Sequence, residues 1–125
     1  MFEITVEESF AAGHYLREYK GKCENPHGHN YRVRVKLAGQ ELDKAGLLVD
    51  FKDLKELMKP VIERLDHQMM NDLTPFTTVN PSAENLAKHF YEETAAKLKS
   101  VTNGRVRVKE VTVWETDSTT ATYRE

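Results

Sequence analysis

The sequence predicts an α+β fold in which a four-stranded antiparallel sheet carries two helices on one face. Three observations lead to this prediction. Two stretches near the N-terminus and two near the C-terminus alternate between apolar and polar residues, as half-buried strands do. Two stretches between them repeat apolar residues at helical spacing. The order strand, strand, helix, helix, strand, strand (ββααββ) is satisfied when both helices cover one face of a single sheet.

The first two strands are expected near the N-terminus. Residues 2–10 alternate and lead into a run of small residues that ends at His14. Residues 15–26 read as a loop, and the second strand is predicted from His29 to Ala38. A turn follows this strand, and we expect the two strands to pair antiparallel.

Two helices and two further strands complete the predicted fold. Asp50 is the expected N-cap of a helix that ends near Asp66 and is kinked at Pro60. The second helix is expected to start around residues 80–82, with Pro81 at its first helical position.

The last two strands are predicted over residues 106–114 and 119–123. A shift of the alternation between Val108 and Val111 indicates a β-bulge. A four-stranded sheet leaves two bare edges, which oligomerisation would cover.

The amino-acid composition limits the classes of function that the chain can have. The 125 residues suit one domain, spanning residues 1–125, with 39% hydrophobic and 30% charged residues. A formal net charge of −2 gives no reason to expect nucleic acid or a membrane surface as partner. No apolar run is long enough for a membrane span, and the N-terminus does not resemble a secretion signal. The single cysteine cannot form an internal disulfide, so we expect a cytoplasmic protein.

The segment Cys23–His29 has the highest concentration of potential metal-binding side chains in the sequence. If His29 opens a strand, His27 lies on the same side of the chain, and Gly28 between them lets the backbone bend close to an ion. His14, at the end of the first strand, joins them if the two strands pair. Three histidines with a vacant fourth position are typical of catalytic zinc, with copper, nickel and iron as competitors.

The role of Cys23 stays open at this point. If Cys23 is a fourth ligand, the site is closed and structural, and the protein is a zinc-stabilised binding module without catalysis. If Cys23 stays free near the metal, it is a base or a nucleophile.

Four other side chains are weaker candidates. Asp66 beside His67 could fix the histidine tautomer for proton transfer, but only past a helix end, because adjacent helical residues do not face each other. Glu115 and Glu84 are ordinary solvated charges taken alone, but a carboxylate can accept two N–H bonds from a guanidine-like edge. We interpret His89, in the second helix, as structural or surface-exposed.

Six stretches resemble one family, and they occur in order along nearly the whole chain: SFAAGH (9–14), CENPHGHN (23–30), LVDF (48–51), LDH (65–67), NPSAEN (80–85) and VWET (113–116). The chain resembles the 6-pyruvoyltetrahydropterin synthase superfamily, and within it the bacterial branch that makes 6-carboxytetrahydropterin in the queuosine pathway. Only three residues separate Cys23 from His27, as in this carboxy branch; the pyruvoyl branch typically has a longer gap.

This resemblance implies a set of roles. The zinc ligands would be His14, His27 and His29. The catalytic residues would be Cys23 as the base, with Asp66 and His67 as the proton relay. The pterin-binding residues would be Glu115, Glu84 and Ser82. The stretch Ser82–Glu84 departs from the hydroxyl-rich pair often seen before that glutamate.

The resemblance also implies the reaction and the assembly. The expected substrate is 7,8-dihydroneopterin triphosphate, and the expected products are 6-carboxy-5,6,7,8-tetrahydropterin, acetaldehyde and triphosphate. A pyruvoyl-forming synthase, which only eliminates triphosphate, is the alternative enzyme. The implied fold is the tunnelling fold, in which subunits join edge to edge into a barrel, usually as hexamers with sites between subunits. Arg17, Lys20 and Lys22 are candidates to meet the phosphates, although we interpret them as a solvated basic loop.

Overall fold

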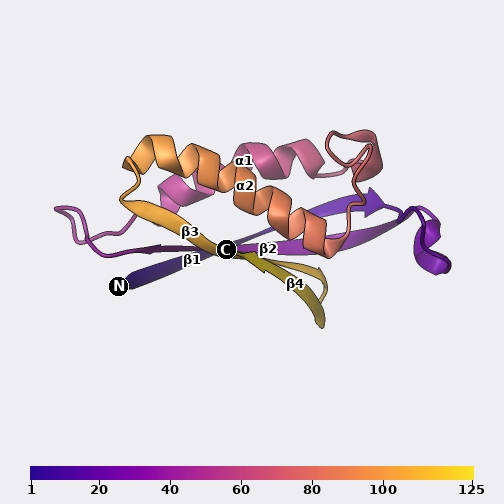
Figure 1. The fold of residues 1–125 in the computed structure, drawn as a ribbon, viewed down its shortest axis with the longest axis horizontal. Coiled ribbons are helices and arrows are strands. Elements are labelled where there is room, and N and C mark those ends of the chain that lie inside the picture. The colour runs from indigo at the N-terminus through magenta and orange to yellow at the C-terminus, as the bar shows by residue number, and fades with distance from the viewer.

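The computed structural model describes residues 1–125 and shows a four-stranded antiparallel sheet with both helices on one side (Figure 1). The sheet order β1-β2-β3-β4 follows the chain, and both helices lie in the connection from β2 to β3. The main elements are β1 (Phe2–His14), β2 (His27–Gly39), α1 (Phe51–Leu65), α2 (Ala83–Thr102), β3 (Val106–Thr116) and β4 (Thr119–Arg124). Two short 3-10 segments are η1 (Lys22–Glu24) and η2 (Met70–Asp72). The predicted α+β class and ββααββ order are confirmed.

The hydrophobic core lies between the sheet and the two helices. Four inward residues in the middle of β2 are no more than 1% exposed: Tyr31, Val33, Val35 and Leu37. The ring of Phe10 on β1 stacks on Tyr31, with 5.1 Å between the ring centroids. Burial of this apolar surface is the main stabilising contribution, and it holds the sheet face that also carries the histidines.

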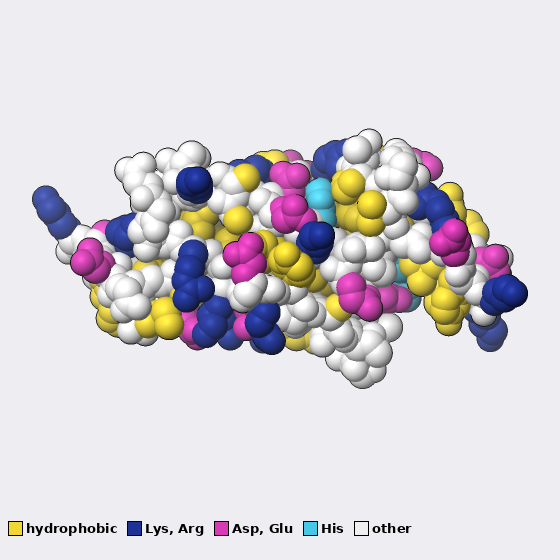
Figure 2. All heavy atoms as spheres, viewed as in Figure 1, with side chains coloured by type: hydrophobic (Ala, Val, Ile, Leu, Met, Phe, Trp, Pro, Cys, Tyr) yellow, Lys and Arg dark blue, Asp and Glu magenta, His cyan; other side chains and the backbone are white.

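The other face of the sheet is polar. The guanidinium groups of Arg32 and Arg34 lie 4.2 and 4.7 Å from the centroid of the Trp114 ring, and both pair with Glu7. Figure 2 shows basic and acidic side chains along the whole molecule, with several basic ones close together at the lower left of the view. No helix is both long enough and apolar enough to cross a membrane.

The second strand is longer than predicted. β1 ends at His14 as expected, although its alternation stops at Phe10, and β2 begins at His27, two residues earlier than the alternation indicates. The cause is pairing: Gly13 lies opposite Gly28, so the ladder of backbone hydrogen bonds continues through residues that have no alternating pattern.

The two helices follow the predicted pattern with one correction. The Asp50 carboxylate accepts a 2.9 Å hydrogen bond from the backbone N–H two residues further on, as an N-cap does, and α1 continues through Pro60. In α2 the N-cap is Ser82, so Pro81 precedes the cap instead of occupying the first helical position. The Pro81 carbonyl oxygen accepts a hydrogen bond from the His14 ring.

The sheet edges are only partly bare. The register of β2 against β3 shifts after Lys36, which confirms the bulge predicted between Val108 and Val111. β1 and β4 are the edge strands. The segment after α1 covers the end of β1, because the Gly13 N–H donates to the Gln68 carbonyl at 2.9 Å. The rest of the β1 edge remains open.

Candidate metal centre and active site

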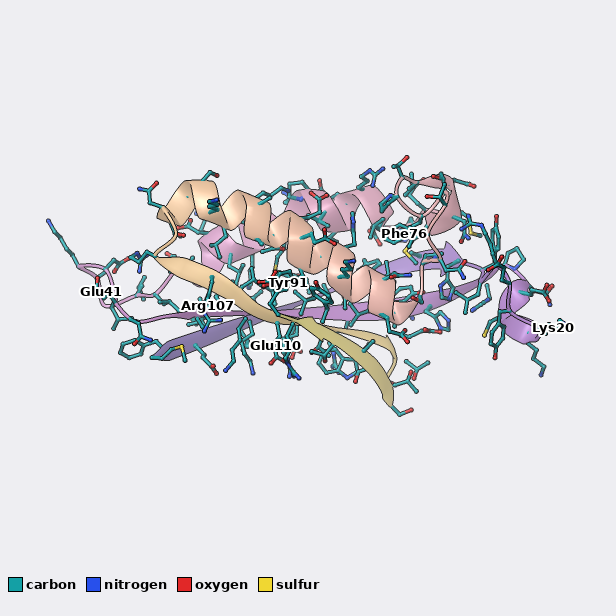
Figure 3. The ribbon with its side chains drawn as sticks, viewed as in Figure 1. Lys20, Glu41, Phe76, Tyr91, Arg107 and Glu110 are labelled. Atoms are coloured by element: carbon teal, nitrogen blue, oxygen red, sulfur yellow. The ribbon has the colours of Figure 1, made fainter.

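The pairing of β1 with β2 brings the three histidines together. His14 lies directly opposite His27, and Ala12 lies opposite His29. Because side chains alternate along a strand, all three imidazoles project from the face that carries Tyr31. Their ring centroids lie 4.6 to 5.1 Å apart. The site therefore continues the core face at one end of the sheet. In Figure 3, Lys20 marks this end, in the loop between β1 and β2, and Glu41 marks the opposite end.

Backbone carbonyls set the tautomers of two of these rings. His14 Nδ1 lies 2.7 Å from the Pro81 carbonyl oxygen, and His27 Nδ1 lies 2.7 Å from that of Asn25. A carbonyl oxygen can only accept, so each Nδ1 carries the proton and each Nε2 of the neutral ring keeps its lone pair. The two Nε2 atoms lie 3.1 Å apart. Two lone pairs at this distance repel each other unless a cation lies between them.

Burial favours the neutral, metal-binding form. His14 is 1% exposed, and this desolvation lowers its pKa below the ordinary histidine value. The Nε2 atom of His29 is buried without a hydrogen-bond partner. An unpaired ring nitrogen on His29, beside the two Nε2 lone pairs of His14 and His27, matches the donor set of a divalent metal that accepts imidazole ligands.

Glu115, at the end of β3, belongs to the same cluster. Its Oε1 atom lies 3.0 Å from His29 Nε2 and 3.9 Å from His14 Nε2. The ligand atoms of His14, His27, His29 and Glu115 all lie within 4.8 Å of one another, so this group could hold a metal ion. From the sequence we considered Glu115 only as a pterin contact. The β2–β3 register could have shown its position, because continuing it by one residue places Glu115 opposite Tyr31.

Cys23 lies outside this converging group. It sits in η1 with a free, half-buried thiol, and its carbonyl accepts a 2.8 Å hydrogen bond from the Leu16 N–H. This bond joins the chain two residues beyond His14 to the 3-10 segment η1. The structure thus brings Glu115, and not Cys23, among the three histidines.

Asp66 and His67 do form a pair, because α1 ends at Leu65 and both residues lie beyond it. His67 Nδ1 lies 3.0 Å from Asp66 Oδ1, and the same oxygen accepts a 2.9 Å hydrogen bond from the Ala11 N–H. These two contacts, that with Ala11 first, hold the pKa of Asp66 below its ordinary value. The His67 side chain is 80% exposed on the β1 edge.

The His67 side chain also lines a cavity of about 470 Å³. The other residues of its wall come from β1, β2 and the chain after α1: Ala11, Ala12, Gly13, Gly28, His29, Asn30, Gln68 and Met69. The small residues of β1 and β2 leave this space open beside the cluster of three histidines and Glu115.

The remaining candidates have other contacts. The Ser82 hydroxyl caps α2 by accepting from the Asn85 N–H at 3.2 Å, and Glu84 is exposed in the first turn. Arg17 is not a freely solvated side chain, since its Nη2 donates to the Phe76 carbonyl at 2.9 Å.

Lys20 and Lys22 are exposed in the loop, as expected for solvated basic residues. His89 packs edge-on against Phe76, with 5.1 Å between ring centroids, and burial lowers its pKa. This position agrees with a structural role for His89.

Sequence reasoning missed two asparagines that hold the chain just beyond His14. Asn71 accepts from the Tyr15 N–H at 3.0 Å and donates to the Tyr15 carbonyl at 2.9 Å. Asn80 makes the same two contacts with Arg17, both at 2.9 Å. The two side-chain amides thus satisfy backbone groups that a neighbouring strand would otherwise pair. Only their position in loops rich in turn residues could have drawn attention to them.

Comparison with known proteins agrees with this geometry. The profile of the family described as 6-pyruvoyl tetrahydropterin synthase matches residues 3–125. The chain is 36% identical to the 6-carboxy-5,6,7,8-tetrahydropterin synthase of Bacillus subtilis, over 98% of this chain and 85% of that protein. It is 33% identical to the 6-pyruvoyl tetrahydrobiopterin synthase of Poecilia reticulata, over 97% and 88% of the two chains.

A solved structure shares the whole fold. The 6-pyruvoyl tetrahydropterin synthase of Caenorhabditis elegans superposes with a TM-score of 0.82 at 32% identity, over 100% of this chain and 97% of that one. This likeness confirms the subunit architecture of the tunnelling fold. Together with the match over residues 3–125, it shows that the chain belongs to the 6-pyruvoyl tetrahydropterin synthase family.

Proposed function

We propose that this protein is a zinc-dependent carbon–carbon lyase of queuosine and 7-deazapurine biosynthesis. It would convert 7,8-dihydroneopterin triphosphate to 6-carboxy-5,6,7,8-tetrahydropterin, acetaldehyde and triphosphate. The observation that carries the proposal is the pair of Nε2 lone pairs, on His14 and His27, that face each other at 3.1 Å beside the orphaned His29 nitrogen. The likeness to the B. subtilis protein supports the choice of product.

The residues of this chain have separate roles in the reaction. Zinc held by His14, His27 and His29 would supply Lewis acidity toward the hydroxyl groups of the substrate side chain. The Cys23 thiolate removes a carbon-bound proton, and His67 moves a proton with the Asp66 carboxylate behind it. The substrate oxidises its own side chain while its ring is reduced, so no external oxidant is needed.

Substrate orientation is the second task. The Glu115 carboxylate accepts two N–H bonds from the amino-pyrimidine edge of the pterin, as a charge-assisted pair. Glu84 and Ser82, at the start of α2, complete the pterin contacts. Lys20 and Lys22 remain solvated in this proposal.

Assembly completes the site. Cys23 lies outside the histidine cluster, and His67 is exposed on the β1 edge. We infer a homo-oligomer, most simply a hexamer, in which open sheet edges pair and Cys23 and His67 reach one site from different subunits. A free thiol in this role suits a reducing compartment such as the cytoplasm.

A pyruvoyl-forming synthase on the same fold is the second candidate. The similarity to the P. reticulata and C. elegans proteins favours it, since their identities are close to that of the carboxy-type relative. Product analysis separates the two: carbon–carbon cleavage releases acetaldehyde, whereas simple elimination releases only triphosphate. Incubation of the purified protein with 7,8-dihydroneopterin triphosphate should give acetaldehyde in equal amount to triphosphate.

The role of Cys23 is tested by Cys23→Ala. This variant should keep its zinc and lose about a hundredfold or more in turnover, as expected when a positioned base is removed. Lys22→Ala, in the same 3-10 segment, is the matched control and should keep both. A Cys23→Ala protein that emerges without metal would instead favour a ligand role and the non-catalytic module.

A further inference from the structure

The Glu115 carboxylate lies at the spacing of a metal ligand. Zinc bonds to nitrogen and oxygen are about 2.0–2.2 Å long, so neighbouring ligand atoms in a tetrahedral site lie about 3.3 Å apart. The Nε2 atoms of His14 and His27 are 3.1 Å apart, and Glu115 Oε1 is 3.0 Å from His29 Nε2 and 3.9 Å from His14 Nε2. All these separations fall around the value expected for ligands of one ion.

A hydrogen bond does not explain this position. His29 Nε2 has no hydrogen-bond partner, although Glu115 Oε1 lies 3.0 Å away, so the contact lacks hydrogen-bond geometry. The Glu115 side chain is 28% exposed, and it could point to solvent. A half-buried carboxylate beside three imidazoles instead fits an arrangement in which all four groups bind the same cation.

We propose that Glu115 is an exchangeable fourth ligand of the metal and that the pterin ring displaces it. The inference rests on the proposed function, in which the same carboxylate binds the pterin edge. That edge needs both carboxylate oxygens for its two parallel N–H bonds, so Glu115 cannot serve the metal and the pterin fully at once.

This competition makes the site selective. A pterin whose 6-substituent carries hydroxyl groups offers oxygen atoms to replace the one that Glu115 withdraws. A pterin with only a methyl group there offers none, so its binding leaves the metal with one ligand fewer. The exchange thus penalises pterins that lack a hydroxylated side chain.

Metal affinity gives the first test. Zinc binding is measured by competition with a chromophoric chelator at fixed pH and fixed protein concentration. Glu115→Gln should weaken zinc binding about tenfold or more, because even groups outside the ligand set change metal affinity by 10–100-fold. Asp117→Asn, two residues away in an exposed turn, removes the same charge and should change zinc affinity less than about twofold.

Thermodynamic coupling gives a second test that needs no variant. Saturating 6-methylpterin should weaken zinc binding to the natural protein, and zinc should weaken 6-methylpterin binding by the same factor, since coupling is reciprocal. Neopterin, with its trihydroxypropyl group, should produce no such loss. Cobalt-substituted protein should report the exchange through its visible absorption, which should change with 6-methylpterin.

The outcomes separate this inference from the proposed function. Unchanged zinc affinity in Glu115→Gln, or absence of coupling between zinc and 6-methylpterin, would overturn the ligand exchange and leave a three-histidine lyase intact. Full zinc retention in His27→Ala would instead contradict the metal site on which the proposed function depends.

Discussion

Asn71 offers the sharpest test of how the chain beyond β1 is held in place. Its side chain is 3% exposed, and it satisfies both backbone groups of Tyr15, at 3.0 and 2.9 Å. Asn71→Ala would leave the N–H and the carbonyl of the half-buried Tyr15 without their protein partner. Each buried unpaired group costs about 1–3 kcal/mol, and because Tyr15 is half-buried we expect the lower part of the summed range, a loss of roughly 2–4 kcal/mol in the free energy of unfolding.

Asn80 provides the matched control. It makes the same pair of hydrogen bonds to Arg17, both at 2.9 Å, but it is only half-buried. Because Asn80 is more exposed than Asn71, water can more easily take the place of its amide in Asn80→Ala, so the expected loss is about 0.5–1.5 kcal/mol. The difference between the two variants isolates the effect of burial.

Thermal unfolding followed by circular dichroism measures both losses. For a chain of this size, 1 kcal/mol corresponds to roughly 3–5 °C, so Asn71→Ala should lower Tm by about 6–20 °C and Asn80→Ala by about 2–8 °C. Both must be compared at equal protomer concentration, because subunit association shifts Tm. If Asn80→Ala cost as much as Asn71→Ala, the argument from burial would be refuted.

Three further predictions concern the Tyr31 hydroxyl, the Asp66 carboxylate and the open sheet edges. Tyr31 is 1% exposed and its hydroxyl has no partner, so Tyr31→Phe should leave Tm unchanged or raise it; a fall in Tm would reveal a hidden partner. The pKa of Asp66 is lowered in the folded protein, so its contribution is present above the unfolded-state value of 3.8 and is lost as pH falls through the lower folded-state pKa. Asp66→Asn should therefore flatten the dependence of stability on pH below about pH 4 in urea unfolding, and an unchanged slope would exclude this linkage. Light scattering should give a mass of about six times the 14.4 kDa chain, because open edges favour pairing, and a stable monomer would contradict this.

Local sequence determined most of the secondary structure. Alternating residues define the strands, and the carboxylate of Asp50 marks the start of α1, because these signals depend only on near neighbours in the chain. The bulge between Val108 and Val111 was readable for the same reason. His14, His27 and His29 could be named as one site, because two consecutive strands that pair antiparallel bring the end of the first beside the start of the second.

The tertiary structure decided the features that depend on distant partners. β1 reaches His14 only because Gly13 pairs with Gly28, and no local pattern encodes that pairing. His14 and the Pro81 carbonyl that orients it are 67 residues apart in the chain. The place of Glu115 depends on the register between β2 and β3. The sequence by itself therefore indicated which groups could carry the chemistry, and long-range backbone pairing decided how they face one another, because the register of two strands depends on both strands together.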